Sequence, residues 1–273
     1  MASRRRLWAL WAVLLGATAP LVAVASPARV VSLNLCADQM LVLLADPGVL
    51  VSVTHLAPEP SQSYVASRVT GLTLNRGRAE EVLALRPDLV VAGEYAARPA
   101  VAMLRRVGID VIDLPIPESF DAIRAQTTLL AQRLGVEARG AGLLADMERR
   151  LAAVNRPASE RRALVLGTNG FTSGQGTLVD DVLRAAGMRN IAAEDLGIIG
   201  FGRVGLEEIV RSDPEVIVVN QPAASEPSLA REFLDHPAFA AYAGRIVRID
   251  PSLWTCGGPY TVGAVEFLAG AGR

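Results

Sequence analysis

VEARGAGLLADMERRLAAVN, residues 136–155, lies near the middle of the chain and separates two halves that share one order of elements. Its apolar side chains recur at helical spacing, at Leu144, Met147, Leu151 and Val154. Charged residues fill the positions between them, and Pro157 follows, where a helix cannot continue. Twenty helical residues span about 30 Å, the width of a small domain. The pattern predicts a helical strut between two lobes.

Two glycines weaken this helix prediction near its start. Gly140 and Gly142 each cost about 1 kcal/mol relative to alanine inside a helix. We therefore expect the N-terminal turn of the strut to be short or bent.

Apolar strands alternate with helices on both sides of the strut. The strands are expected at 29–33, 49–54, 88–92, 109–114, 162–167, 215–220 and 245–249, and the helices at 37–45, 80–86, 97–107, 119–134, 178–186, 207–212, 229–242 and 260–268. This alternation is typical of parallel βαβ units.

An internal repeat relates the two halves. AEEVLALRPDLVVAG (79–93) matches LEEIVRSDPEVIVVN (206–220) at an offset of 127 residues, with Glu80 opposite Glu207. Arg76 meets Arg203 at the same offset, and GIDVIDLP (108–115) resembles GRIVRIDP (244–251). A helix, a proline-acidic turn and a buried strand are thus used twice, which indicates two lobes built on one plan.

We therefore predict an α/β protein with two Rossmann-like lobes, each with a parallel sheet, and a ligand cleft between them. The predicted division is an N-terminal lobe at 26–135, the bridging helix at 136–155 and a C-terminal lobe at 156–273. Ligands bind beyond the carboxyl ends of strands in open parallel sheets. Those ends are expected at 34–36, His55, 93–95, 171–174 and 254–258.

Composition excludes several functional classes. The formal net charge is −1, and the sequence has neither a basic run beyond the N-terminus nor an acidic tail, so we expect no nucleic-acid partner. All 27 basic residues are arginine, which excludes Schiff-base and P-loop lysines.

Residues 1–25 have the pattern of a secretory signal peptide. Arg4–Arg6 form a charged region, an apolar run follows, and Ala23-Val24-Ala25 is a small-residue cleavage site. We expect export to the periplasm after cleavage at Ala25, in an oxidising compartment.

Over residues 29–268 the chain resembles the periplasmic substrate-binding proteins of ABC importers for cobalamin, haem and ferric siderophores. The resemblance is carried by the two repeat units, the strut and GFTSGQGTLVDDVLRAAGMRNI (170–191). Its FTSG turn and following helix are similar to the cobalamin-binding branch. The resemblance implies a single bridging helix, little closure on binding, and delivery of a cobalt or iron chelate to a permease dimer by a monomer. It implies no resident cofactor and no catalysis.

The resemblance also gives the repeat a function. One exposed glutamate on each lobe of such proteins docks onto arginines of the permease, and the matching positions are Glu80 and Glu207. Two like permease subunits offer two like basic patches, which two equivalent carboxylates meet symmetrically. Both carboxylates also suit helix N-termini, and the two roles are compatible.

The remaining site candidates are residues expected at the cleft. Phe171, Phe201 and Trp254 align with cleft aromatics of the cobalamin-binding branch, and core packing is the alternative. Glu94 and Tyr95 follow a buried strand; the tyrosine is a candidate axial ligand for ferric haem. His55 is a second candidate metal ligand, whereas His236 is expected in a surface loop.

The two cysteines depart from the family pattern. Cys36 and Cys256 fall at cleft-lining turns, one in each lobe. A disulfide across the lobes requires Cα atoms within about 7 Å. A disulfide, two free thiols and metal ligation all remain open.

Two other readings are weaker. Residues 200–205 fit the G-x-G-x-x-G pattern, but a dinucleotide site needs a full strand before it and a long helix after it. A secreted two-domain α/β enzyme would need clustered catalytic or metal-binding residues, which the sequence lacks. We expect a binding protein for a cobalamin-type corrinoid or a ferric siderophore, with haem as the alternative ligand.

Overall fold

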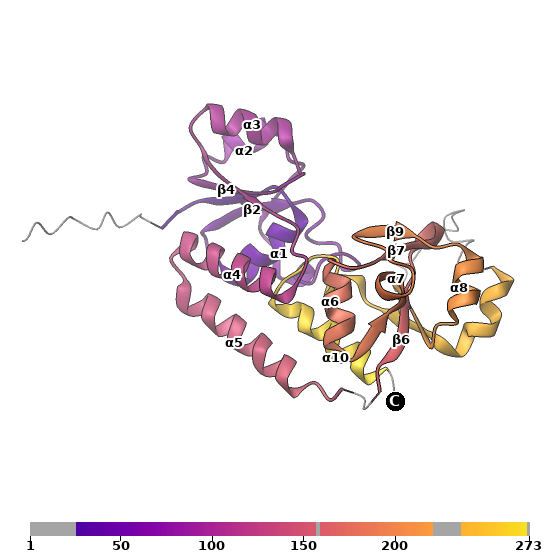
Figure 1. Cartoon of the computed structure of the whole chain (residues 1–273). Coiled ribbons are helices and arrows are strands. Elements are labelled where there is room, and N and C mark those ends of the chain that lie inside the picture. Colours follow the sequence, from indigo (N-terminus) through magenta and orange to yellow (C-terminus); the bar gives the residue numbers. More distant parts are fainter. Residues whose placement is uncertain (1–25, 157–158, 221–235, 272–273) are drawn as a thin grey trace, which may run out of the picture.

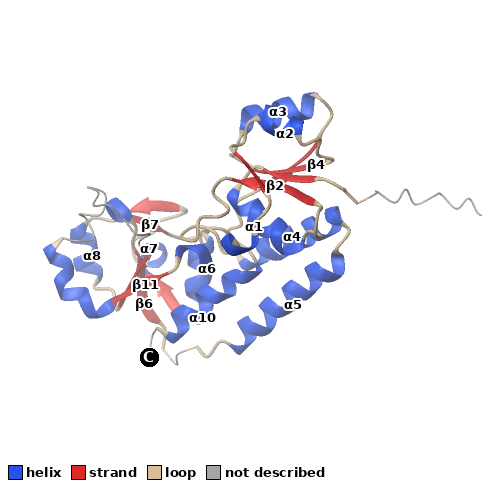
Figure 2. Ribbon diagram, turned by 180° about the vertical axis from the view of Figure 1, so that it is seen from behind, coloured by secondary structure: helices blue, strands red, loops and turns tan. Residues whose placement is uncertain are grey.

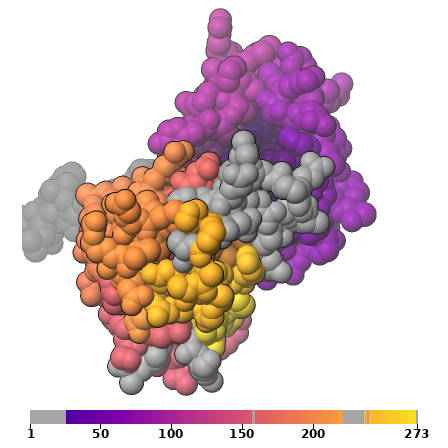
Figure 3. Space-filling model, turned by 90° about the vertical axis from the view of Figure 1, so that its right-hand side faces the viewer, coloured from indigo at the N-terminus to yellow at the C-terminus, as the bar shows by residue number. Residues whose placement is uncertain are grey.

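The computed structural model describes residues 26–156, 159–220 and 236–271. The predicted signal peptide and the first half of the helix expected at 229–242 lie outside the described residues. The fold class is confirmed: two α/β lobes with parallel sheets stand at an angle to each other, and the helix α5 (Glu137–Ala153) runs along the side that joins them (Figure 1). In the space-filling view, the N-terminal lobe lies above and against the C-terminal lobe (Figure 3).

The N-terminal lobe contains a five-stranded parallel sheet in the order β3-β2-β1-β4-β5. Its strands are β1 (Val30–Ser32), β2 (Leu50–Thr54), β3 (Thr73–Asn75), β4 (Leu89–Gly93) and β5 (Asp110–Leu114), and its helices are α1 (Leu35–Leu44), η1 (Ala66–Arg68), α2 (Ala79–Ala84), α3 (Arg98–Arg106) and α4 (Phe120–Leu134). Alternate residues of β4 enter different cores: Leu89 and Val91 pack with α1 and α4, and Val90 and Ala92 pack with α2 and α3. The sheet therefore has helices on both faces (Figure 2).

The C-terminal lobe contains a four-stranded parallel sheet in the order β11-β10-β6-β8, with a small antiparallel pair, β7-β9, beside it. Its strands are β6 (Arg161–Val165), β7 (Phe171–Ser173), β8 (Met188–Asn190), β9 (Phe201–Arg203), β10 (Val216–Asn220) and β11 (Ile246–Ile249). Its helices are η2 (Thr168–Gly170), α6 (Leu178–Ala185), α7 (Ile191–Glu194), α8 (Leu206–Ser212), η3 (Pro237–Arg245), η4 (Pro251–Leu253), η5 (Pro259–Thr261) and α10 (Val262–Gly270).

The structure explains most of the internal repeat. β4 and β10 occupy the same position in their sheets, each beside the first strand of its lobe. Asp88 and Glu215, which precede these strands, accept hydrogen bonds from the backbone N–H groups of Arg29 and Arg162 at the start of β1 and β6. Equivalent side chains thus fix equivalent strand starts, and the two lobes share one plan.

The strut is a continuous helix, and the expected defect at its N-terminus is wrong. Helix α5 begins at Glu137 and continues through both glycines to Ala153. A Cβ on Gly140 would lie 2.5 Å from the Cβ of Ala131, so glycine allows α4 and α5 to approach closely. This packing offsets the low helix propensity of glycine. Nothing in the structure explains Gly142.

Both ends of α5 are attached to the lobe they reach. Arg139 hydrogen-bonds the Leu44 carbonyl and pairs with Asp46 in the N-terminal lobe. Arg150 forms a two-point ion pair with Glu266 of α10, with N–O distances of 2.9 and 2.6 Å. Helix α4 runs beside α5 and enters both cores, through Ile123 on one side and Leu130 on the other. The lobes are therefore joined by two packed helices, although only α5 carries the chain across.

Strands β3, β7, β8 and β9 are not among the sequence predictions. Each has three residues, and Leu74 and Phe201 in the middle or at the start of β3 and β9 are exposed. Strands this short at sheet edges carry too few buried residues to produce a readable hydrophobic pattern.

A buried carboxyl group under the first sheet predicts a pH-dependent stability. Asp38 of α1 is fully buried and accepts hydrogen bonds from the Thr54 N–H and hydroxyl. Burial raises the pKa of Asp38 to about 6, although hydrogen bonds from Ser32 and Thr54 oppose the shift. The pKa of Asp38 is higher in the folded protein than in the unfolded chain, so the protonated carboxyl group favours folding. This contribution to the free energy of unfolding is complete at about pH 4 and is lost as the pH rises through about 6.

We expect Asp38 to lower the free energy of unfolding by about 2–3 kcal/mol between pH 4 and pH 7. Asp38→Asn should flatten that part of the pH profile, measured by urea denaturation across this range. The exposed-residue variant Glu59→Gln should keep the slope of the unchanged protein. A steeper or unchanged profile in Asp38→Asn would contradict the prediction.

Candidate functional site

A cleft of about 720 Å³ lies between the lobes, at the carboxyl ends of both sheets. In the first sheet, β2 and β3 lie on one side of β1, and β4 and β5 lie on its other side. In the second sheet, β6 lies between β8 and β10 in the same way. These are the topological switch points where ligands bind in open parallel sheets. Asn34 and Tyr95 come from the first, and Gly167 and Asn220 from the second.

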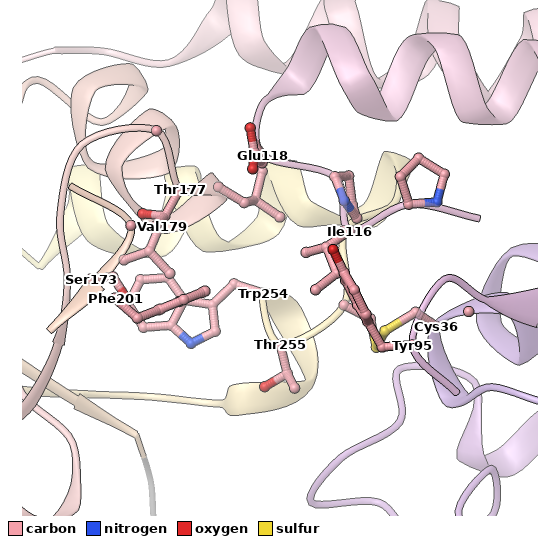
Figure 4. A pocket seen from close by; sticks show the side chains of 18 of the residues that line it. Cys36, Tyr95, Ile116, Glu118, Ser173, Thr177, Val179, Phe201, Trp254 and Thr255 are labelled. Atoms are coloured by element: carbon pink, nitrogen blue, oxygen red, sulfur yellow. A yellow bond between two sulfur atoms is a disulfide. The ribbon is translucent and has the colours of Figure 1, made fainter. Parts of the chain in front are cut away.

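The walls of the cleft carry exposed aromatic rings. Phe171 and Phe201 stack with ring centres 5.6 Å apart and are 45% and 58% exposed, so they are not core residues. Tyr95, which is 75% exposed, stands across the open space from Phe201 and Trp254 (Figure 4). Half-exposed aromatic side chains around a cavity offer flat apolar surface to a flat ligand.

Trp254 is both a cleft residue and a core residue. It lines the cleft, yet it is buried and packs in the core of the C-terminal lobe. Its Nε1–H donates to Oδ1 of Asn220 at 2.9 Å. This hydrogen bond satisfies the indole and fixes the ring at the end of β10.

Cys36 and Cys256 form a disulfide, which decides among the three alternatives. Their Cα atoms lie 5.0 Å apart, and the bond joins α1 of the N-terminal lobe to the loop after Trp254 in the C-terminal lobe. It forms part of the cleft wall (Figure 4). The rings of Tyr64 and Tyr260 stack across the same junction at 4.3 Å, and the Tyr260 hydroxyl donates to the Cys256 carbonyl.

His55 does not line the cleft, and its predicted position there is wrong. It is exposed, and its N–H donates to the Asn75 carbonyl of the edge strand β3. The loops after β1, β4 and β5 line the cleft, and the loop after β2 does not. His236 is exposed, as expected. The described residues contain no cluster of three or more His, Cys, Asp and Glu side chains that could hold a metal ion.

The charge of the cleft wall is one-sided. Glu94 and Glu118 line it, both exposed, and no arginine or histidine is found among the described residues that line it. Hydroxyl and amide side chains complete the polar surface, at Asn34, Gln126, Thr172, Ser173, Thr177, Asn220 and Thr255. On the described part of this surface, an anionic ligand finds no basic side chain.

Glu80 and Glu207 lie on α2 and α8 and do not line the cleft. Each falls in the first turn of its helix and is exposed. Figure 1 places these helices at the outer ends of the two lobes, away from α5. In the described part of the chain, neither side chain forms a hydrogen bond or an ion pair.

Several lining residues were absent from the sequence predictions. Ile116 and Glu118 follow β5, whose carboxyl end meets the same sheet edge, so strand position alone could have identified them. Tyr64, which stacks on Tyr260 at the lobe junction but does not line the cleft, lies in a long irregular segment with no readable pattern. The G-x-G-x-x-G segment contains β9 and ends at Gly205, the N-cap of the seven-residue helix α8. It therefore lacks the preceding strand and long helix of a dinucleotide site.

Among the described helices, none is long and apolar enough to cross a membrane.

Comparison with known proteins agrees with this architecture. The model of the periplasmic binding protein family matches residues 30–253. A cobalamin-binding protein of Halobacterium salinarum is 31% identical over 205 residues, covering 72% of this chain and 55% of that protein. A vitamin B12-binding protein of Salmonella typhi is 30% identical over 174 residues, 62% of each. The chain thus spans less than two thirds of these relatives.

A solved structure covers more of the chain. The periplasmic heme-binding protein of Roseiflexus sp. RS-1, in apo form, is 28% identical, covers 91% of this chain and 100% of its own, and superposes with a TM-score of 0.72. A family match over most of the chain and a shared two-lobe fold lead to one assignment: the chain belongs to the periplasmic binding protein family.

Proposed function

We propose that this protein is the substrate-binding protein of an ABC importer and captures a cobalamin-type corrinoid in the interlobe cleft. One observation carries the choice of ligand: the cleft wall is aromatic and apolar, bears two carboxylates, and has no basic side chain among its described residues. The relatives named for cobalamin and vitamin B12 support the same choice. No chemistry on the ligand is proposed.

Charge separates the candidate chelates. A corrinoid is a flat macrocycle with amide side chains and little net charge, so aromatic rings and neutral hydrogen-bonding groups suit it. Hemin carries propionates, and ferric tris-catecholates are strongly anionic. Transferring an anion into a partly enclosed cleft beside Glu94 and Glu118 costs free energy through desolvation and like-charge repulsion. The same wall that accepts a corrinoid therefore disfavours these chelates.

Heme is the second candidate, and Tyr95 is the observation that favours it. Its side chain is 75% exposed within the cleft, where a phenolate can serve as an axial ligand to ferric iron. The fold shared with a heme-binding protein also supports this alternative.

Delivery to the permease is assigned to Glu80 and Glu207. Both carboxylates are exposed, occupy equivalent positions on the two lobes and have no partner within the described chain. We infer that the protein acts as an exported monomer, with residues 1–25 removed, and that each lobe meets one of two like permease subunits.

A binding panel on the purified mature protein tests the ligand assignment. We expect cyanocobalamin to bind more tightly than 10 μM, about −7 kcal/mol, and hemin and a ferric tris-catecholate to bind at least tenfold more weakly. Isothermal titration calorimetry gives the affinities, and absorption spectra identify metal ligation.

Neutral variants of the two cleft glutamates test whether their charge determines which ligand binds. Glu94→Gln with Glu118→Gln should strengthen binding of the two anionic chelates severalfold and change cyanocobalamin affinity less than twofold. Glu59→Gln, outside the cleft, should change neither. If hemin binds tightly and shows a charge-transfer band that Tyr95→Phe abolishes, heme rather than a corrinoid is the ligand. If none of the three ligands binds more tightly than 10 μM, both ligand classes are wrong.

A further inference from the structure

The internal repeat contains identities that the fold does not explain. Between residues 76–91 and 203–218, five positions carry the same amino acid at an offset of 127: Arg76, Glu80, Glu81, Pro87 and Val91, with Arg203, Glu207, Glu208, Pro214 and Val218. When the same amino acid recurs at equivalent positions of the two lobes, it should have the same role in each lobe, either in folding or in binding.

Three of the five pairs have an intramolecular cause. Val91 and Val218 are fully buried in the centre of their sheets, and Pro87 and Pro214 are buried in the turn before them. Glu81 and Glu208 close the N-termini of α2 and α8. The Glu81 carboxylate accepts from the Arg76 N–H at 2.7 Å, and the Glu208 carboxylate accepts from the Gly205 N–H at 2.8 Å.

Two pairs remain, and both are exposed and charged. Within the described residues, the side chains of Arg76, Arg203, Glu80 and Glu207 form no hydrogen bond or ion pair. Neither arginine lies in the cleft wall. Folding and ligand binding therefore leave these four side chains without a role, although they recur together on both lobes.

We propose that Arg76 and Arg203 are docking residues, which form with Glu80 and Glu207 one charged doublet on each lobe. The proposal rests on the importer function given above. Its partner is a membrane protein of two like subunits, each presenting an acidic side chain beside a basic one. Arginine suits this role because its planar guanidinium can bind a carboxylate through two hydrogen bonds.

The local structure keeps each doublet together. The bond from the Arg76 N–H to Glu81 holds Arg76 against the first turn of α2, where Glu80 lies. On the other lobe, β9 pairing with β7 fixes Arg203 opposite Phe171, four residues before Glu207. A doublet of opposite charges adds little net attraction to a partner but fixes the orientation of binding. If the partner bound the other way round, its acidic side chain would face the glutamate and its basic side chain the arginine.

Uptake of labelled cyanocobalamin by cells of the source organism tests the doublet, with each variant replacing the chromosomal gene. Arg76→Glu with Arg203→Glu should lower uptake at least tenfold, as should Glu80→Ala with Glu207→Ala. The purified variants should bind cyanocobalamin within twofold of the unchanged protein. The matched control is Arg78→Glu with Arg211→Glu: both arginines are exposed, lie on the same two helices or their caps, and have no arginine at the repeat position.

The outcomes are separable. If uptake is unchanged in Arg76→Glu with Arg203→Glu but lost in the glutamate variant, only the glutamates dock and the arginine proposal is wrong. An equal loss in the Arg78→Glu, Arg211→Glu control would also overturn it, since general surface charge would then be the cause. If deletion of the gene leaves uptake intact, the importer function itself fails, and the doublet fails with it.

Discussion

Replacing Cys36 and Cys256 with alanine is expected to lower the free energy of unfolding by about 2–5 kcal/mol. The disulfide joins residues 220 positions apart, so it restricts a very large part of the unfolded chain. It also joins the lobes at the cleft, beside the α4–α5 pair and the Tyr64–Tyr260 stack. Urea denaturation of the unchanged protein and the double variant measures the difference.

Reduction provides the control for the disulfide. Dithiothreitol should bring the unchanged protein close to the stability of the double variant and leave the variant itself unaffected. Two thiols that react in denaturant without reductant would contradict the disulfide. We expect cyanocobalamin affinity to fall only severalfold in the double variant, because α5 still fixes both lobes through Arg139 and Arg150.

Phe171→Ala with Phe201→Ala is expected to weaken cyanocobalamin binding about 10- to 100-fold, or about 1.4–2.8 kcal/mol. The two rings stack on each other and expose a continuous apolar surface to the cleft. Their removal takes away aromatic area that a flat macrocycle would cover. Stability should change little, since neither ring is buried in a core.

The matched control for the aromatic pair is Phe267→Ala. Phe267 is 41% exposed on α10 and does not line the cleft, so its removal should leave the affinity unchanged. Calorimetric titration of both variants makes the comparison. An affinity within twofold of the unchanged protein in the Phe171→Ala, Phe201→Ala variant would show that the ligand does not contact these rings.

The sequence predicted correctly those structural features that depend on residues close together in the chain. Alternating strands and helices predicted the parallel sheets, and a strut predicted at 136–155 is a helix at 137–153. The repeat at an offset of 127 residues predicted that β4 and β10 occupy equivalent positions, and their sheets confirm it. Each of these features depends on hydrophobic periodicity or on turn residues, which neighbouring positions encode.

Prediction was weaker where the answer depends on strand order. His55 and Tyr95 both follow strands, yet only Tyr95 reaches the cleft: the loop after β4 lines it and the loop after β2 does not. Glu118 reaches the cleft from the loop after β5. Periodicity indicates that a segment is a strand but not which strands become its neighbours.

The sequence by itself determined the fold class, the two-lobe plan and the repeat that places Glu80 opposite Glu207. The tertiary structure decided the rest: the Cys36–Cys256 disulfide, the role of Gly140 and the charge of the cleft wall. All three depend on distances between residues far apart in the chain. The cysteines are separated by 220 positions, and Gly140 is necessary because α4 lies against it. Helix α5 is continuous between the lobes at Gly140 because packing on α4, rather than helix propensity, favours glycine there.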